Sequence, residues 1–273
     1  MTQVDVAPSV EATIPMLRLE GVRAGFGQQT ILHGVDLTVR RGEVAAVFGL
    51  NGAGKSVTLK TVAGVVPARS GRIIFDGRDV TTLSPEQRVE TGMAHVPQGR
   101  QVFPQLSVEQ NLRLGAYTLR RRQRSAYAPL LEEVYARFPI LGERRRQLAG
   151  TMSGGQQASL AVARALMARP KLILVDEPTA GLAPTIIAEL LGILGRVRET
   201  GVTILLVEQN VPFGLRLADS AHILQRGRVV HSGPVGELDS ERLAHHLGVG
   251  RLLRSGVGTA LVDAGEAQVG SAG

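Results

Sequence analysis

Cysteine and tryptophan are absent from the chain of 273 residues, and aromatic residues make up only 3% of it. Without cysteine the chain can form no disulfide and perform no thiol chemistry, which favours the cytosol. The scarcity of aromatic side chains argues against a surface that binds nucleic acid by stacking on its bases. No apolar run approaches the ~18 residues of a membrane span, and the N-terminus shows neither the basic start nor the apolar core of a signal peptide.

Lysine is almost absent too. It occurs only at positions 55, 60 and 171, so 28 of the 31 basic residues are arginine. The net charge is +7 and the pI is about 10.6. A charge of this size fits a nucleic acid, an anionic lipid surface or a mere preference for arginine. Because base-stacking residues are few, we expect no nucleic-acid partner.

A phosphate-binding loop is the most informative feature that is present. Residues 49–56 read Gly-Leu-Asn-Gly-Ala-Gly-Lys-Ser, a complete G-x-x-x-x-G-K-[ST] motif. The apolar run 43–48 before it predicts a strand and residues 58–63 after it predict a helix, which is the context that the motif needs. The glycines let backbone N–H groups face phosphate oxygens. Lys55 would reach the β- and γ-phosphates and Ser56 would bind Mg²⁺, so the loop predicts a nucleoside triphosphate as ligand.

Two carboxylates end another predicted strand. Residues 172–175 read Leu-Ile-Leu-Val and are followed by Asp176 and Glu177. An aspartate at the end of a strand beside the phosphate loop can hold the water shell of Mg²⁺. The glutamate after it can orient or deprotonate an attacking water. Alone, such a pair would more often cap a helix after a core strand, but its combination with a phosphate loop favours the catalytic interpretation.

The segment Ser153-Gly154-Gly155-Gln156 opens a predicted helix that runs to about Arg169. Ser153 and Gln156 match the S-x-x-Q capping box, which is a purely structural explanation. The two glycines cost helix stability and make sense if another group approaches the backbone closely. A serine hydroxyl and bare N–H groups at the start of a helix also form an anion site.

The rest of the pattern predicts one α/β domain over residues 16–250, between a tail at 1–15 and a flexible tail at 251–273. Residues 99–152 change to helical spacing with ten arginines, which predicts an inserted helical subdomain. The segment 171–207 reads strand, amphipathic helix (185–199), strand, a βαβ unit. Further strands are expected at 16–22, 31–39, 71–77 and 94–97, a short helix after Ser84, and a hairpin at 220–232.

In order and spacing, these motifs resemble the ATP-binding subunit of ATP-binding-cassette (ABC) transporters. The resemblance implies a P-loop NTPase core, in which a mostly parallel sheet is flanked by helices and an antiparallel β part lies at the N-terminus. It identifies residues 49–56 as the Walker A loop, 172–177 as Walker B with the catalytic Glu177, and 152–156 as the signature. The loop residues implied to contact ATP are Gly49, Asn51, Gly52, Ala53, Gly54, Lys55, Ser56 and Val57.

Two further positions follow from the same resemblance. Gln98, after Val96 and Pro97, matches the Q-loop glutamine, which contacts Mg²⁺ or water and faces the membrane subunit. Phe26 lies where the family places an aromatic ring on adenine, although a strand-edge phenylalanine can also belong to the core. In the family, two subunits enclose two ATP molecules, and the signature of one meets the Walker A loop of the other.

The chain departs from the general family at two places. Gln209 stands at the position of the switch histidine, and Ala183 replaces the aspartate that usually follows Walker B. A glutamine amide can donate to the γ-phosphate but cannot carry a proton as histidine does. Together with the segments 94–100 and 102–104, these departures resemble the ATPase subunits of branched-chain amino-acid importers and their urea and amide relatives. Such importers commonly pair two different ATPase subunits.

The resemblance therefore implies an ATP-hydrolysing subunit on the cytoplasmic face of the membrane. Its expected partners are transmembrane permease subunits, a second ATPase subunit in a homo- or heterodimer and, indirectly, a periplasmic or extracellular binding protein. The alternatives are a urea or short-chain amide importer and a soluble ABC ATPase outside transport, although the latter usually carries two cassettes or a long coiled coil. A non-hydrolysing regulatory subunit fits Gln209 and Ala183 but not the intact Lys55, Asp176 and Glu177. The six histidines show no ligand spacing, so no metal held by protein ligands alone is expected.

Overall fold

The computed structural model describes residues 14–99, 101–118 and 126–238. The expected C-terminal tail, most of the N-terminal one and the arginine run 120–124 lie outside these ranges. The described part contains a four-stranded antiparallel sheet, a six-stranded mostly parallel sheet, and helices around them. Within it, no helix is both long and apolar enough to cross a bilayer.

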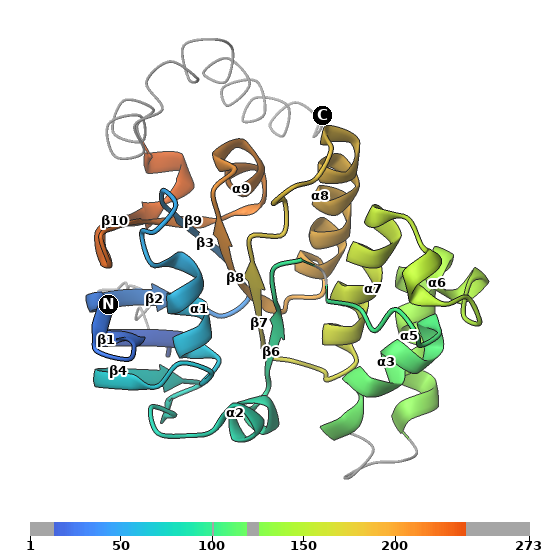
Figure 1. Ribbon diagram of the computed structural model, residues 1–273, viewed down its shortest axis with the longest axis horizontal. Helices are drawn as coiled ribbons and strands as arrows, with labels where there is room; N and C mark the ends of the chain where they lie inside the picture. The colour runs from blue at the N-terminus through green and yellow to red at the C-terminus, as the bar shows by residue number, and fades with distance from the viewer. Residues whose placement is uncertain (1–13, 100, 119–125, 239–273) are drawn as a thin grey trace, which may run out of the picture.

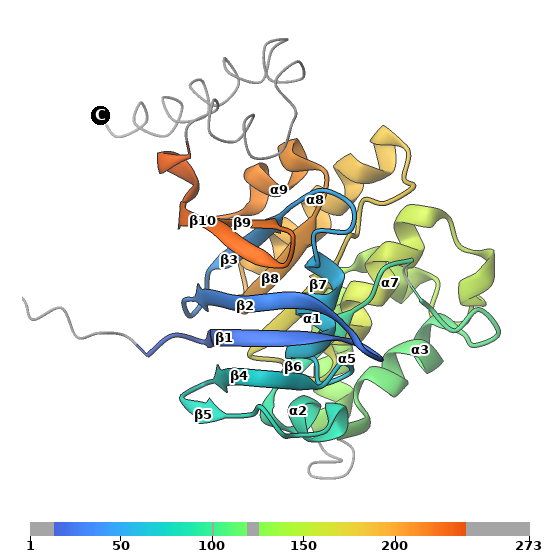
Figure 2. The ribbon, with the colours of Figure 1, turned by 60° about the vertical axis from the view of Figure 1, so that its left-hand side comes forward.

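The antiparallel sheet has the strand order β2-β1-β4-β5. It is formed by the N-terminal part of the chain, drawn in blue and cyan in Figure 2. Its strands are β1 (Leu17–Phe26), β2 (Gln29–Val39), β4 (Ala68–Phe75) and β5 (Arg78–Asp79). The predicted end of the first strand at residue 22 was wrong, because β1 continues through a tight hairpin into β2. A Cβ at Gly25 would lie 2.0 Å from the Gln29 carbonyl oxygen, so this hairpin requires glycine there. The strand β1 is longer than predicted because it pairs with β2 on one side and β4 on the other. The alternation of residues in the sequence does not reveal this pairing.

The second sheet has the order β10-β9-β3-β8-β7-β6 among the described residues. Its strands are β3 (Val44–Phe48), β6 (Met93–Val96), β7 (Leu172–Asp176), β8 (Thr203–Glu208), β9 (Ser220–Gln225) and β10 (Arg228–Pro234). All are parallel except β10, which forms the expected hairpin with β9. Strands β3, β7 and β8 are buried along their whole length, as in parallel sheets covered on both faces.

The register of the three central strands places the chemistry at one edge of this sheet. Phe48 at the end of β3 pairs with Glu208 at the end of β8, and Asp176 at the end of β7 pairs with Val207. The phosphate loop, the acidic pair and the loop containing Gln209 each follow one of these strands. Three segments far apart in the sequence therefore meet at the carboxyl edge of the sheet, where α/β proteins bind their ligands.

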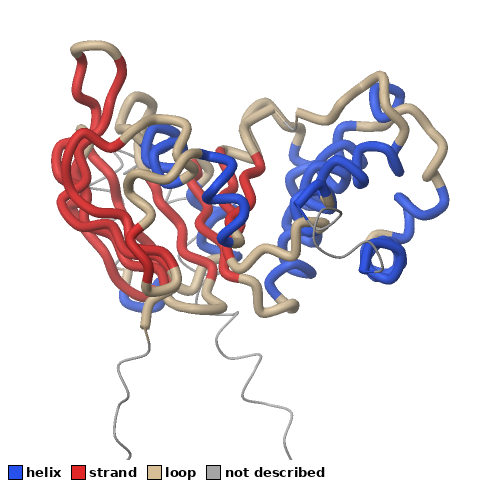
Figure 3. Tube along the Cα trace, turned by 90° about the horizontal axis from the view of Figure 1, so that it is seen from below, coloured by secondary structure: helices blue, strands red, loops and turns tan. Residues whose placement is uncertain are grey.

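Helices cover the parallel sheet and also form a separate group on one side (Figures 1 and 3). They are α1 (Lys55–Val62), α2 (Pro85–Thr91), α3 (Val108–Gly115), α5 (Tyr127–Arg137), α6 (Pro139–Glu143), α7 (Gly154–Leu166), α8 (Pro184–Arg198) and α9 (Val211–Leu217), with short 3₁₀ turns at Ala149–Thr151 and Val235–Glu237. The stretch 99–152 contains α3, α5 and α6, and α7 packs on α3 and α6. Helix α9 and strand β5 were not expected from the sequence.

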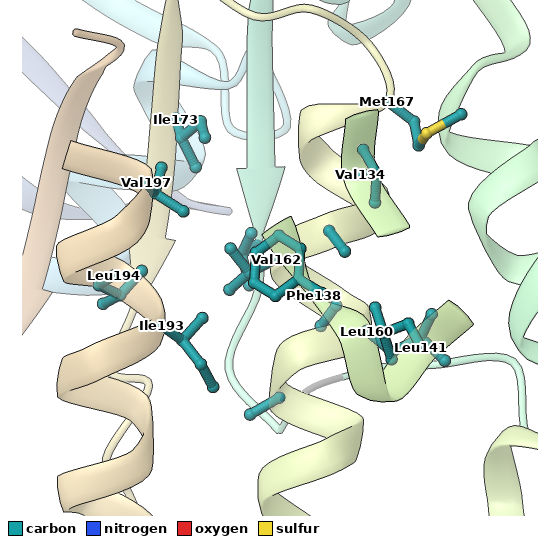
Figure 4. Close-up of a cluster of buried hydrophobic side chains, with 14 of the residues drawn as sticks. Val134, Phe138, Leu141, Leu160, Val162, Met167, Ile173, Ile193, Leu194 and Val197 are labelled. Carbon is teal, nitrogen blue, oxygen red and sulfur yellow. The ribbon is translucent and has the colours of Figure 1, made fainter. Parts of the chain in front are cut away.

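An apolar core joins the helical group to the parallel sheet. Figure 4 shows Val162 of α7 beside Phe138, which joins α5 to α6, with Leu194 on α8 and Ile173 on β7 around them. Each is nearly or fully buried, and burial of one such side chain stabilises the fold by roughly 1.5–3 kcal/mol. This core fixes the position of α7 relative to β7, the strand that ends in Asp176.

Arg88 on α2 is 1% exposed and hydrogen-bonds to the C-terminal end of α1, the helix that follows the phosphate loop. Its guanidinium donates to the carbonyl oxygens of Thr61 and Val62, both at 2.7 Å, and to those of Thr81 and Leu83. Carbonyls of the last helical turn have few partners within their own helix. The Gly64 N–H donates to the Thr61 carbonyl at 3.1 Å, and Arg88 adds a donor to it and to the Val62 carbonyl. Burial lowers the pKa of Arg88, and nearby Asp79 partly opposes this shift.

Replacement of Arg88 by methionine should lower the free energy of unfolding by about 3 kcal/mol, because buried carbonyl groups lose their donors while the apolar stem is kept. Chemical denaturation of Arg88→Met and of the matched exposed variant Arg78→Met measures the effect. The control should stay within about 0.5 kcal/mol of the parent. Equal stabilities of the two variants would contradict a structural role for Arg88.

Candidate nucleotide-binding site

The loop between β3 and α1 has a backbone that only glycine adopts readily. Gly52 and Gly54 have φ values of 79° and 106°, in the left-handed region. At Gly49 a Cβ would lie 2.5 Å from the Leu224 carbonyl oxygen of β9. The β9–β10 turn supports the loop from behind, because the Gly227 N–H donates to the Ala53 carbonyl at 2.9 Å. The loop shape therefore depends both on its own glycines and on a turn about 170 residues later in the chain.

Lys55 lies inside this loop and is 3% exposed. Its ammonium donates to the carbonyl oxygens of Gly49 (2.9 Å) and Leu50 (3.2 Å) and lies 3.0 Å from Glu177 Oε1. The loop thus holds one positive charge at its centre, beside the first residues of helix α1. Such a charge, together with the N–H groups at the helix start, is suited to bind an oligophosphate.

Ser56 and Asp176 bring two oxygen ligands together. The Ser56 hydroxyl donates to Asp176 Oδ1 at 2.8 Å, although the residues come from α1 and the end of β7. Asp176 is 2% exposed, and burial raises the pKa of its carboxyl, an effect that the Ser56 hydrogen bond partly opposes. A hydroxyl and a buried carboxylate at this spacing fit Mg²⁺, which prefers oxygen ligands and completes its octahedron with phosphate oxygens and water. In the described ranges, no cluster of three His, Cys, Asp or Glu side chains offers another metal site.

Glu177 has a strained backbone. Its φ of 40° is rare for a residue other than glycine and costs about 1–3 kcal/mol. Its N–H donates to the Val207 carbonyl of β8 at 2.9 Å, which holds the residue in this conformation. The carboxylate lies between Lys55 and Gln98, whose amide Nε2 donates to Glu177 Oε2 at 3.2 Å. In this conformation the carboxylate contacts Lys55 of the phosphate loop.

A pocket of about 410 Å³ opens above the loop. Its lining consists of Gln29, Ile31, Asn51, Gly52, Gly54, Lys55, Ser56, Val57 and Glu177. Gln29 and Ile31 of β2 were missed by sequence reasoning, and no local signal marks them, because only the packing of the antiparallel sheet brings them here. Phe26 is 53% exposed and pairs with Gln29 across the β1–β2 hairpin. Its exposure excludes the core position that the sequence also allowed.

The residues 153–156 do not line this pocket. The capping box that they predict does form: the Ser153 hydroxyl accepts from the Gln156 N–H at 3.3 Å, and Gln156 Oε1 accepts from the Ser153 N–H at 3.1 Å. At Gly155 a Cβ would lie 1.8 Å from Glu189 Oε2 of α8, the end of an exposed and flexible side chain that can move aside. Ser153 itself is exposed at the start of α7.

Gln209 directly follows β8, so it lies at the same edge of the sheet as the phosphate loop. Its side chain is exposed and forms no hydrogen bond to any residue that the structure describes. Its backbone N–H donates to Glu208 Oε2 at 2.8 Å. The structure therefore brings Lys55, Ser56, Gln98, Asp176 and Glu177 together but leaves the Gln209 side chain outside this set.

The fold and the site define a nucleotide-hydrolysing cassette of the P-loop class. The family model described as "ABC transporter" matches residues 32–180, more than half of the chain. The chain belongs to the ATP-binding subunits of the ABC transporter family, and it is an ATPase. This confirms the predicted fold class and enzyme activity.

Two curated relatives carry related names. The chain is 43% identical over 215 residues to the "High-affinity branched-chain amino acid transport ATP-binding protein BraG" of Pseudomonas aeruginosa, covering 79% of this chain and 91% of that protein. It is 37% identical over 224 residues to the "Probable branched-chain amino acid transport ATP-binding protein LivF" of Archaeoglobus fulgidus, covering 82% and 94%. Among solved structures, an ATP-binding cassette in its ADP conformation is 26% identical with a TM-score of 0.75, over 88% of this chain and all of the other.

Proposed function

We propose that the chain is the ATPase subunit of an importer that takes up branched-chain amino acids through partner permease subunits. One observation supports ATP hydrolysis by this chain: five polar side chains lie together at one edge of the parallel sheet. They are linked by the contacts Lys55–Glu177, Gln98–Glu177 and Ser56–Asp176. The support for the cargo is the naming of the two relatives in Pseudomonas aeruginosa and Archaeoglobus fulgidus.

ATP binding is assigned to the phosphate loop and its surroundings. Lys55 exchanges its carbonyl partners for the β- and γ-phosphate oxygens, and the N–H groups of the loop surround the same oxygens. Phe26 lies across the hairpin from Gln29, a pocket residue, so its exposed ring is placed to stack on adenine. Ser56, Asp176 and Gln98 would hold Mg²⁺, which neutralises phosphate charge when it is bound.

Hydrolysis is assigned to Glu177 as general base. A carboxylate beside Lys55 is placed to accept a proton from the water that attacks the γ-phosphate, while the ammonium stabilises the charge on the phosphate. Gln98 donates to the second oxygen of Glu177 and so fixes its orientation. The exposed side chain of Gln209 is assigned to donate a hydrogen bond to the phosphate, but its amide cannot relay a proton.

The signature residues Ser153, Gly154, Gly155 and Gln156 are assigned to a partner's site. They lie outside the pocket of their own chain, and they start a helix of 13 residues with an exposed serine hydroxyl. This end is suited to contact the phosphates bound by a second ATPase subunit, in a homo- or heterodimer. The permease subunits place this dimer at the cytoplasmic face of the membrane, and a binding protein delivers the cargo from outside.

Uptake by the source organism tests the cargo. A strain without this gene should lose uptake of labelled leucine and keep uptake of labelled urea, and the gene itself should restore the leucine uptake. A Lys55→Ala gene should not restore it, because that chain cannot use ATP. Loss of urea uptake alone would assign the chain to a urea importer, and normal uptake of both would reject transport of either cargo.

A further inference from the structure

Glu208, the last residue of β8, is a buried carboxylate that the proposed chemistry has not used. It is 1% exposed, and both of its oxygens accept hydrogen bonds. Oε1 accepts from the backbone N–H and the hydroxyl of Thr179, at 3.0 and 2.6 Å. Oε2 accepts from the backbone N–H groups of Gln209 and Asn210, at 2.8 and 2.7 Å. Each oxygen therefore holds one loop.

The first loop carries the general base. Thr179 lies two residues after Glu177, whose left-handed backbone is strained. A strained conformation persists only when its surroundings hold it in place. The Val207 carbonyl holds the Glu177 N–H, and the next residue of the same strand, Glu208, holds Thr179. Two consecutive residues of strand β8 therefore hydrogen-bond to the loop that contains Glu177.

The second loop carries Gln209. Its N–H and that of Asn210 point at the carboxylate of Glu208, and the Asn210 side chain in turn caps helix α9 by accepting from the Phe213 N–H. The direction in which the Gln209 side chain leaves the strand is therefore set by the same carboxylate. Removal of a carboxylate from water costs several kcal/mol unless hydrogen bonds compensate it, and here all four donors come from the two loops.

We infer that Glu208 is a positioning residue for hydrolysis, which couples the Glu177 loop to the Gln209 loop. This inference rests on the proposed role of Glu177 as general base. An ionised carboxylate is an acceptor at both oxygens, whereas an amide presents two donors on one side. Either orientation of a glutamine at 208 would therefore turn its NH₂ group toward a backbone N–H of one loop and weaken the hold on that loop. The Thr179 hydroxyl can reverse its bond and accept, but the backbone N–H groups can only donate.

ATP turnover and ATP binding by the Glu208→Gln chain test this role. We expect kcat to fall about 10- to 100-fold, as for loss of other groups that orient a catalytic side chain. The Kd for ATP should change less than about 3-fold, because Glu208 lies outside the pocket. Thr179→Val, which loses only the hydroxyl bond, should reduce kcat less, and Thr179→Ser should turn over like the parent.

A double-mutant cycle separates positioning from simple destabilisation. If Glu208 acts through Glu177, adding Glu208→Gln to the Glu177→Gln chain should leave its single-turnover rate unchanged within about 2-fold. The control is Ile73→Ala in β4, which removes buried apolar volume from the antiparallel sheet and should lower stability without lowering kcat at 25 °C.

Two results would overturn the inference: a kcat of Glu208→Gln within about 2-fold of the parent, or a rate that falls by the same factor with and without Glu177. A parental chain without ATPase activity, or a Glu177→Gln chain at the parental rate, would instead refute the proposed function. The two failures are therefore distinguishable.

Discussion

Replacement of Glu177 by glutamine should slow ATP turnover by about 10²–10⁴-fold while ATP still binds. The amide keeps the size of the side chain but cannot accept a proton from water. The carboxylate lies 3.0 Å from the Lys55 ammonium, so the substitution also removes a negative charge that competes with phosphate for Lys55. Binding should therefore be kept, and the variant should accumulate as a nucleotide-bound dimer.

Steady-state hydrolysis, equilibrium binding and light scattering measure these three properties of Glu177→Gln. The matched control is Glu199→Gln, which changes an exposed glutamate after α8 and should leave turnover unchanged. If Glu177→Gln hydrolyses ATP at the parental rate, another residue accepts the proton.

Replacement of Lys55 by alanine should weaken ATP binding by about 10²–10³-fold, because charge-assisted contacts to phosphate are worth roughly 1.5–3 kcal/mol each. The loop carbonyls of Gly49 and Leu50 lose their donor, but the left-handed glycines still shape the loop. Circular dichroism should therefore show a folded chain, and calorimetric titration with ATP should show little heat.

Lys171→Ala serves as the control, since Lys171 precedes β7 at the opposite end of the sheet and pairs with Asp76. Its ATP affinity should match that of the parent within about 2-fold. Unchanged affinity in a folded Lys55→Ala chain would remove the basis for the phosphate-loop assignment.

The phosphate loop could be predicted from the sequence alone. Residues 49–56 are contiguous, and their conformation follows from glycines whose freedom is a local property. Asp176 and Glu177 could also be predicted, because a strand pattern ends at them and parallel strands present their carboxyl ends at one edge. In both cases the physical cause lies within a few residues of the functional group.

The hairpin and the signature show an intermediate case. The hairpin at 220–232 was predicted, but only the packed sheet shows that Gly227 in its turn supports the phosphate loop through Ala53. The capping box of Ser153 was predicted and forms, yet only the structure shows that Gly155 lies against the Glu189 side chain of another helix. The local sequence pattern predicted the hairpin and the capping box, and only the tertiary structure shows the distant residues that they contact.

The sequence by itself determined the ligand class, the phosphate loop and the acidic pair, because each is a short run whose residue types carry its chemistry. Only the tertiary structure decided that Phe26 is exposed, that Gln29 lines the pocket, and that Arg88 and Glu208 are buried charges with backbone partners. A charged residue in a sequence predicts a solvated surface. Its burial becomes visible only when segments distant in the chain supply the hydrogen bonds that replace water.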